Sequence, residues 1–70
     1  MKIQEIISNA SEEQRIAVMS EVAVKGKVSL HTVVAWFNGS RTPKFLYQEL
    51  IASVIKEHCG IEATLEELFG

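Results

Sequence analysis

Residues 27–39 read KVSLHTVVAWFNG, and this stretch carries the signals for the start, the buried side and the end of one short helix. Ser29 is a residue type that caps helices, because its side-chain oxygen accepts a hydrogen bond from an otherwise unpaired backbone N–H. Asn38-Gly39 is a typical stop signal. Apolar residues recur between them at the spacing of one helix face: Val33, Trp36 and Phe37. We therefore expect a helix from about Ser29 to Asn38.

The chain before this stretch predicts two helices. Ser11 and Gln14 form a capping box, and the helix that they open should run to about Lys25. Gly26 is expected to end it in the left-handed conformation that glycine adopts readily. The residues expected to face the core are Ile16, Met19, Val22 and Ala23 in this helix, and Ile3, Ile6 and Ile7 in a shorter helix over residues 2–8.

The chain after the stretch predicts a long helix and a short one. Thr42 is expected as the cap and Pro43 as the first residue of a helix to about His58, because that position has no use for the N–H that proline lacks. Gly60 should close it, and Thr64 with Glu67 forms a second capping box. The expected core residues are Leu46, Tyr47, Leu50, Ile51, Val54 and Ile55, followed by Leu65, Leu68 and Phe69. Residues 1–70 thus predict one all-α domain of four main helices and a short fifth.

The charges are unevenly distributed along the chain. The net charge of the 70 residues is −2, yet residues 22–48 hold four basic side chains and no acidic one. Residues 1–21 and 49–70 are both acidic on balance. Because local fields steer binding more than the total charge does, the basic middle segment is the expected binding region.

Several classes of protein are not expected from this composition. Cys59 is the only cysteine, so no internal disulfide can form, and the two histidines follow no metal-ligand spacing. No pairing of a nucleophile with a base and no phosphate loop is present, so we expect neither an enzyme nor a cofactor, metal or small-molecule substrate. The apolar runs are too short for a membrane span, and no signal peptide is visible. A soluble, cytoplasmic protein is expected.

Residues 27–39 resemble the Cro- and phage-repressor-like (lambda-repressor-like, XRE-type) helix-turn-helix family. In that family a turn ending in Val-Ser leads into a helix with Thr-(Val/Ile) and then Trp-x-x-Gly. The similarity continues through Ser40-Arg41-Thr42-Pro43 and reaches the C-terminal segment, and covers about residues 22–69. Lys27 stands where the family usually has glycine. The resemblance implies a four- to five-helix lambda-repressor-like DNA-binding domain.

The resemblance also implies which residues meet DNA. Leu30 and Ala35 would pack on thymine methyl groups, and His31 would donate to a purine N7 or to a phosphate. The loop after the helix would neutralise phosphates. The DNA-binding residues implied in this way are Lys27, Ser29, Leu30, His31, Thr32, Ala35, Asn38, Arg41 and Lys44.

Two functions follow as hypotheses. The first is sequence-specific binding of double-stranded DNA by a small phage or bacterial transcriptional regulator, such as a repressor, acting as a homodimer. The second is a helix-turn-helix scaffold used for protein contacts, an antirepressor or a DNA mimic, suggested by the acidic ends and the apolar face of Leu30, Val34 and Ala35. For the homodimer, Ile61, Leu65, Leu68 and Phe69 either pair with a second copy or close the core of the monomer.

Overall fold

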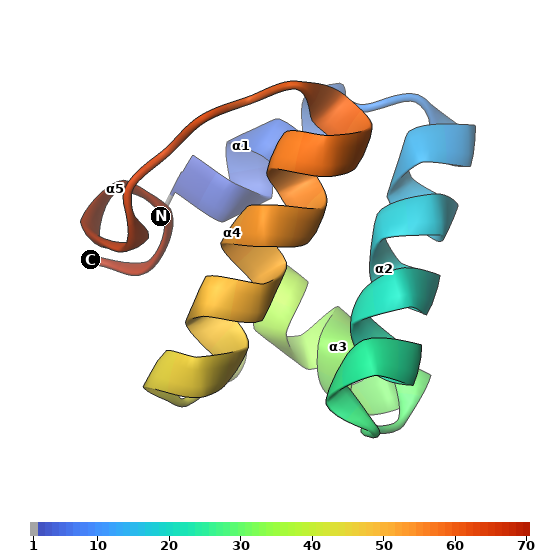
Figure 1. Cartoon of the computed structure of the whole chain (residues 1–70), viewed down its shortest axis with the longest axis vertical. Helices are drawn as coiled ribbons and strands as arrows, with labels where there is room; N and C mark the ends of the chain where they lie inside the picture. The colour runs from blue at the N-terminus through green and yellow to red at the C-terminus, as the bar shows by residue number, and fades with distance from the viewer. Residues whose placement is uncertain (1) are drawn as a thin grey trace.

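The computed structural model describes residues 2–70, and this part of the chain is helical without a strand (Figure 1). The all-α prediction is therefore confirmed. Four helices and a short fifth follow one another with brief connections: α1 (Lys2–Asn9), α2 (Glu12–Gly26), α3 (Leu30–Phe37), α4 (Phe45–Cys59) and α5 (Leu65–Phe69).

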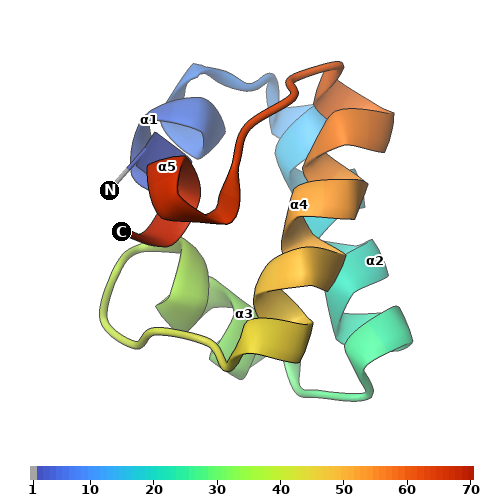
Figure 2. The ribbon, with the colours of Figure 1, turned by 60° about the vertical axis from the view of Figure 1, so that its left-hand side comes forward.

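All five helices contribute to a single apolar core. Helices α2 and α4 lie side by side, and α3 packs across their lower ends in Figure 1. Figure 2 shows α5 folded back beside α1, so that the two ends of the chain close the core together. The buried side chains are Ile3, Ile6 and Ile7 of α1, Val18 and Val22 of α2, Val33, Trp36 and Phe37 of α3, Ile51, Val54 and Ile55 of α4, and Leu68 of α5.

Helix α2 starts as predicted and buries most of the predicted face, because Val22 is buried and Met19 and Ala23 pack against the core. The capping box is present, with Ser11 Oγ accepting from Gln14 N and Gln14 Oε1 accepting from Ser11 N, both at 3.1 Å. The prediction that Ile16 faces the core is wrong, because its side chain is 57% exposed and Val18 is buried instead. Two residues along a helix correspond to about 160° around its axis. Val18 and Val22 form the buried stripe, and Ile16 therefore points to solvent.

The turn after α2 also differs from the prediction. Gly26 remains helical, and Lys27 takes the left-handed conformation with φ 55° and ψ 44°. A Cβ atom on Gly26 would lie 3.3 Å from Cε1 of Tyr47 and 3.4 Å from Cδ2 of Leu50. Gly26 therefore allows α4 to approach closely, and the next residue makes the turn.

Replacing Lys27 by glycine is expected to stabilise the fold. A left-handed conformation costs a non-glycine residue about 1–2 kcal/mol, and the extra freedom of glycine in the unfolded chain offsets part of the gain. The expected net gain is about 0.5–1 kcal/mol in the free energy of unfolding, measured by urea denaturation. Lys27→Ala is the matched control, because it removes the charge and keeps the strain. Equal stability of the glycine and alanine variants would contradict this explanation.

Helix α4 begins later than predicted. Pro43 is not its first residue, because Lys44 is the N-cap, with φ −68° and ψ 160°, and the helix starts at Phe45. The Pro43 side chain is buried, and its carbonyl accepts a hydrogen bond from Gln48 Nε2 at 3.0 Å. The buried proline thus holds the chain before Lys44 against the protein. The helix starts two residues later than expected, at Phe45.

The apolar stripe of α4 is narrower than predicted. Ile51, Val54 and Ile55 are buried and Leu50 is half-buried, but Leu46 is 76% exposed. Leu46 precedes Ile51 by five residues, which places it about 140° around the helix. The expectation that Leu46 belongs to the core is therefore wrong. The end of the helix is as predicted, since Gly60 adopts a left-handed conformation with φ 68°.

The C-terminal segment closes the core of the single chain. The second capping box is confirmed, with Thr64 N donating to Glu67 Oε1 at 2.9 Å and Glu67 N donating to Thr64 Oγ1 at 3.1 Å. Leu68 is fully buried, and Leu65 and Phe69 are half-buried. Of the two expectations for this segment, core closure accounts for Leu68, whose side chain is not accessible to a second copy.

Candidate nucleic-acid interface

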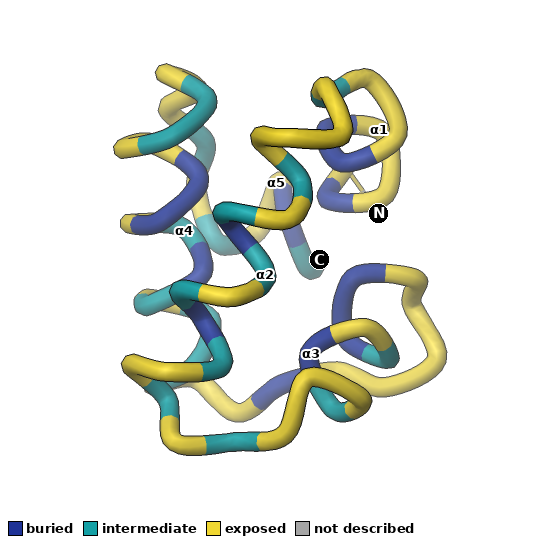
Figure 3. Tube along the Cα trace, turned by 90° about the vertical axis from the view of Figure 1, so that its right-hand side faces the viewer, coloured by how far each residue is buried: buried dark blue, intermediate teal, exposed yellow. Residues whose placement is uncertain are grey.

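Helix α3 is anchored by one face and leaves the other at the surface. Val33, Trp36 and Phe37 are buried in the core. Leu30 is 52% exposed, Val34 is 40% exposed, and His31 is also exposed. In Figure 3 the helix lies at the lower edge of the molecule, with buried segments turned inward and exposed segments outward. The structure therefore presents a helix of eight residues along one edge of the protein.

The N-terminus of α3 is held by two of the predicted site residues. Ser29 Oγ accepts a hydrogen bond from Thr32 N at 3.2 Å, and the two hydroxyl oxygens lie 3.0 Å apart. Ser29 is the N-cap, as expected from the sequence. The hydroxyls of Ser29 and Thr32 thus bind each other and fix the start of the helix, while Leu30 and His31 project from its first turn.

A shallow hollow on the outer side of α3 brings four of the predicted residues together. His31 and Ala35 line it from the helix, and Asn38 and Arg41 line it from the chain that follows. Its volume is about 310 Å³. Val34, which was predicted only as part of an apolar face, lines the same hollow.

A second hollow lies on the other side of Arg41. Thr32, Arg41 and Lys44 line it together with the aromatic side chains of Trp36 and Tyr47. Its volume is about 370 Å³. Arg41 borders both hollows, and the nine predicted residues are distributed over these two hollows and the start of α3. Lys27, Ser29 and Leu30 line neither hollow and lie around the start of α3.

The loop between α3 and α4 is folded back on α3 by its own hydrogen bonds. Arg41 N donates to Ala35 O at 3.2 Å. Asn38 Oδ1 accepts from Ser40 N at 3.0 Å and from Ser40 Oγ at 2.6 Å. The Gln4 side-chain amide of α1 donates to the carbonyl of Asn38. Asn38 therefore organises the loop through its oxygen atoms, and Gln4 is a supporting residue that no local sequence signal identified.

The predicted cations at this edge carry uncompensated charge. Within residues 2–70, Lys27, Arg41 and Lys44 take part in no ion pair. The other lysines are paired elsewhere on the molecule: Lys2 with Glu67, Lys25 with Glu21 and Lys56 with Glu62. Since residues 22–48 contain no acid, the edge formed by α3 and its loops is the basic part of the chain.

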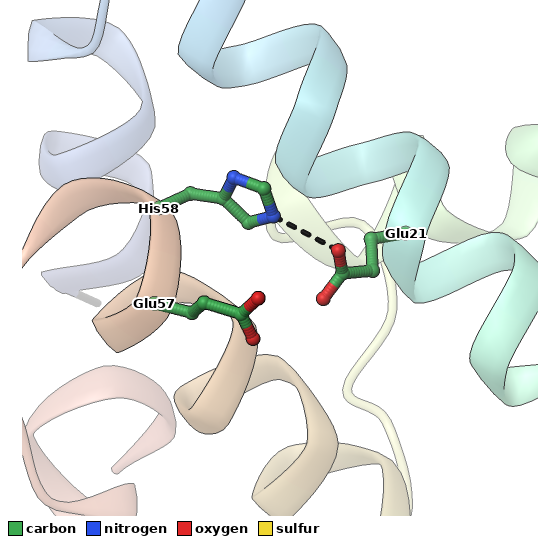
Figure 4. A group of neighbouring side chains, drawn as sticks. All are labelled: Glu21, Glu57 and His58. Carbon is green, nitrogen blue, oxygen red and sulfur yellow. Dashed lines mark hydrogen bonds and ion pairs between the residues drawn. The ribbon is translucent and has the colours of Figure 1, made fainter.

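A second polar cluster joins α2 to α4 away from this edge (Figure 4). His58 Nε2 lies 2.9 Å from Glu21 Oε1, and Lys25 Nζ lies 3.1 Å from Glu21 Oε2. The hydrogen bond with His58 is the main cause of a lowered pKa of Glu21, and the nearby Lys25 ammonium lowers it further. The sequence indicated only that His58 lies near a helix end, because nothing local links it to Glu21, 37 residues earlier.

The same cluster has the residue types of a metal site. Potential ligand atoms of Glu21, Glu57 and His58 lie within 4.8 Å of one another. Figure 4 shows the Glu57 carboxylate beside that of Glu21. One oxygen of Glu21 is hydrogen-bonded to His58, and the other is buried without a hydrogen-bond partner among residues 2–70 but lies within ion-pair distance of Lys25 Nζ. We therefore interpret the cluster as an ion-pair network that fastens α2 to α4.

Glu21→Gln is expected to reduce stability in a pH-dependent way. Because the pKa of Glu21 is lower in the folded protein than its ordinary value of 4.5, its ionisation favours folding at neutral pH. This contribution is lost as the pH falls from 4.5 through the lower folded-state pKa. Thermal unfolding of variant and parent should therefore differ at neutral pH and converge in acid. Glu49→Gln, on the exposed side of α4, is the control, and a pH-independent difference for Glu21→Gln would refute the assignment.

Comparisons of the chain with family models, with curated proteins and with solved structures gave no match. Of the helices in residues 2–70, none is both long and apolar enough to cross a bilayer. The function is therefore inferred from α3, from the loop that follows it and from the charge around them.

Proposed function

We propose that the protein binds double-stranded DNA through α3 and acts as a small transcriptional regulator with a lambda-repressor-like arrangement of helices. The observation that carries the proposal is the exposed side of α3, flanked by Lys27, Arg41 and Lys44, which form no ion pair with any residue from 2 to 70. A single α-helix fits the major groove of B-DNA, and the second helix of a helix-turn-helix is the one that enters it. Helices α2 and α3 with the turn at Lys27 have this order.

In this proposal the residues of the two hollows contact different parts of the DNA. His31 and Ala35 face the base edges, where His31 donates a hydrogen bond and Ala35 and Leu30 contact thymine methyl groups. Arg41 and Lys44 neutralise phosphates, which supplies affinity without sequence information. Lys27 adds a third phosphate contact at the start of the helix. No arginine, glutamine or asparagine projects from α3, so DNA shape contributes to selectivity.

We further propose that two copies bind one palindromic site, because a single module with few phosphate contacts binds weakly at physiological salt. The test is an electrophoretic mobility shift with random duplex at low and moderate salt. The expected result is a shift that weakens as salt rises. Sedimentation with a palindromic duplex selected from a random library counts the chains on that duplex. Absence of any shift at low salt would overturn the proposed function, and a single chain on a palindromic duplex would overturn the pairing alone.

His31→Ala is expected to change which duplexes are preferred more than it changes affinity for random DNA. His31 is exposed on the first turn of α3 and lines the outer hollow, where a donor would reach a base edge. Selection from a random duplex library checks this, with Glu49→Ala on α4 as a control that should select the same sites as the parent. Identical selected motifs for parent and His31→Ala would exclude a base-reading role.

One observation favours a second candidate, in which α3 docks on a protein. Leu30 and Val34 are both large apolar side chains exposed on α3. Exposed apolar groups of this kind gather at protein interfaces. The two candidates differ in salt dependence, since an apolar contact weakens little with salt and a phosphate contact weakens strongly. Leu30→Asp, which adds a negative charge, should weaken both, and Arg41→Ala should weaken only DNA binding.

A further inference from the structure

The hollow between α3, its following loop and α4 is an open depression in the surface. Its volume is about 370 Å³, so a single ring can lie in it with part of the ring left in solvent. Trp36, Pro43 and Tyr47 form its apolar wall. The rings of Trp36 and Tyr47 are 5.0 Å apart between centroids and tilted by 37°, so the two rings brace each other.

The charged groups of this hollow are cationic. They are Arg41 and Lys44, and the neutral hydroxyl-bearing side chains are Thr32 and Thr42. Neither cation is paired within residues 2–70, and no acid occurs between residues 22 and 48. Two positive charges beside an apolar aromatic wall favour a ligand that has both a negative charge and a flat apolar body.

We propose that this hollow binds a small aromatic anion. The ring of the ligand lies against the wall formed by Trp36, Pro43 and Tyr47, and its carboxylate or phosphate lies between Arg41 and Lys44. A guanidinium binds such an anion through two parallel hydrogen bonds, which makes Arg41 the main anchor. Because Arg41 and Lys44 also belong to the proposed DNA interface, the ligand competes with DNA, and this consequence rests on the proposed function.

The test uses the full chain without DNA. Trp36 is the only tryptophan, so its indole N–H gives a single side-chain signal in a proton–nitrogen NMR spectrum. Because Trp36 lines the hollow, this signal reports on binding there. Benzoate is the probe, benzyl alcohol is the matched neutral ring, and acetate is the matched charge without a ring. The expected result is a saturable shift with benzoate and at least about tenfold weaker binding of the other two compounds. Phenyl phosphate in place of benzoate distinguishes the two anionic groups. Equal shifts with benzoate and benzyl alcohol, or no saturation, would overturn the site.

Variants connect the NMR result to the proposed residues. Arg41→Gln with Lys44→Gln is expected to weaken benzoate binding by about tenfold or more, because charge-assisted hydrogen bonds are lost. Lys27→Gln, which removes a cation outside the hollow, should bind benzoate like the parent. Circular dichroism shows that each variant is folded. Parent-like binding by the double variant would overturn the placement of the anion.

A mobility shift with added benzoate tests the competition separately. Release of the duplex as benzoate saturates the indole signal, beyond the release caused by acetate at the same concentration, would support it. Saturable benzoate binding with unchanged DNA affinity would support the site and overturn the competition. If benzoate binds and no duplex is shifted at low salt, the site stands and the proposed DNA-binding function fails.

Discussion

Replacing Arg41 and Lys44 together by alanine is expected to weaken binding to every duplex by about a hundredfold or more at moderate salt, since each charge-assisted contact contributes about 1.5–3 kcal/mol. Both side chains are unpaired within residues 2–70 and lie beside α3. Each phosphate contact releases about one counterion, so the slope of log affinity against log salt should become shallower by about two. Fluorescence anisotropy with random and selected duplexes over a range of salt concentrations measures both quantities.

The matched control for this double variant is Lys56→Ala. Lys56 lies in the last turn of α4, at the opposite end from α3 in Figure 1, and pairs with Glu62 at 3.0 Å. Its removal should leave both the affinity and the salt slope unchanged. A double variant with the affinity and slope of the parent would show that DNA, if bound, docks on another surface.

Leu68→Ala is expected to destabilise the fold strongly. The Leu68 side chain is fully buried and anchors α5, which packs against α1 and α4. Truncating a buried leucine costs about 2–5 kcal/mol in the free energy of unfolding. A domain of 70 residues has roughly 4–10 kcal/mol in total, so much of its stability would be lost. Urea denaturation of parent and variant measures the difference.

Leu46→Ala is the matched control for Leu68→Ala, because it makes the same chemical change at a side chain that is 76% exposed. Its stability should stay within about 0.5 kcal/mol of the parent. The pair also separates core closure from self-association. The stabilities of parent and variant are therefore compared at high and at low protein concentration. If the difference between them vanished at low concentration, Leu68 would act between chains, and this would contradict the packing of α5 in the single chain.

The elements whose signals are local could be read from the sequence. The capping boxes of Ser11 with Gln14 and of Thr64 with Glu67, and the cap at Ser29, each depend on atoms three residues apart. The same holds for the buried face of α1, which follows from its isoleucine spacing. A short-range pattern determines such features because the partners are already neighbours in the unfolded chain. The basic segment of residues 22–48 is likewise a property of the sequence alone.

Contacts between distant segments determined the rest. Gly26 lies where the side chains of Tyr47 and Leu50 leave little room for a Cβ atom, and it stays within the helix. The left-handed turn that glycine was expected to make falls on Lys27 instead. Burial of Pro43 moved the start of α4 to Phe45, and the helix pairing turned Ile16 and Leu46 to solvent. The tertiary structure also placed His58 against Glu21. It gathered six of the nine predicted site residues around two hollows that meet at Arg41 and left the other three outside them. These features depend on how helices pack, and helical periodicity fixes the faces of a helix without specifying which neighbour covers them.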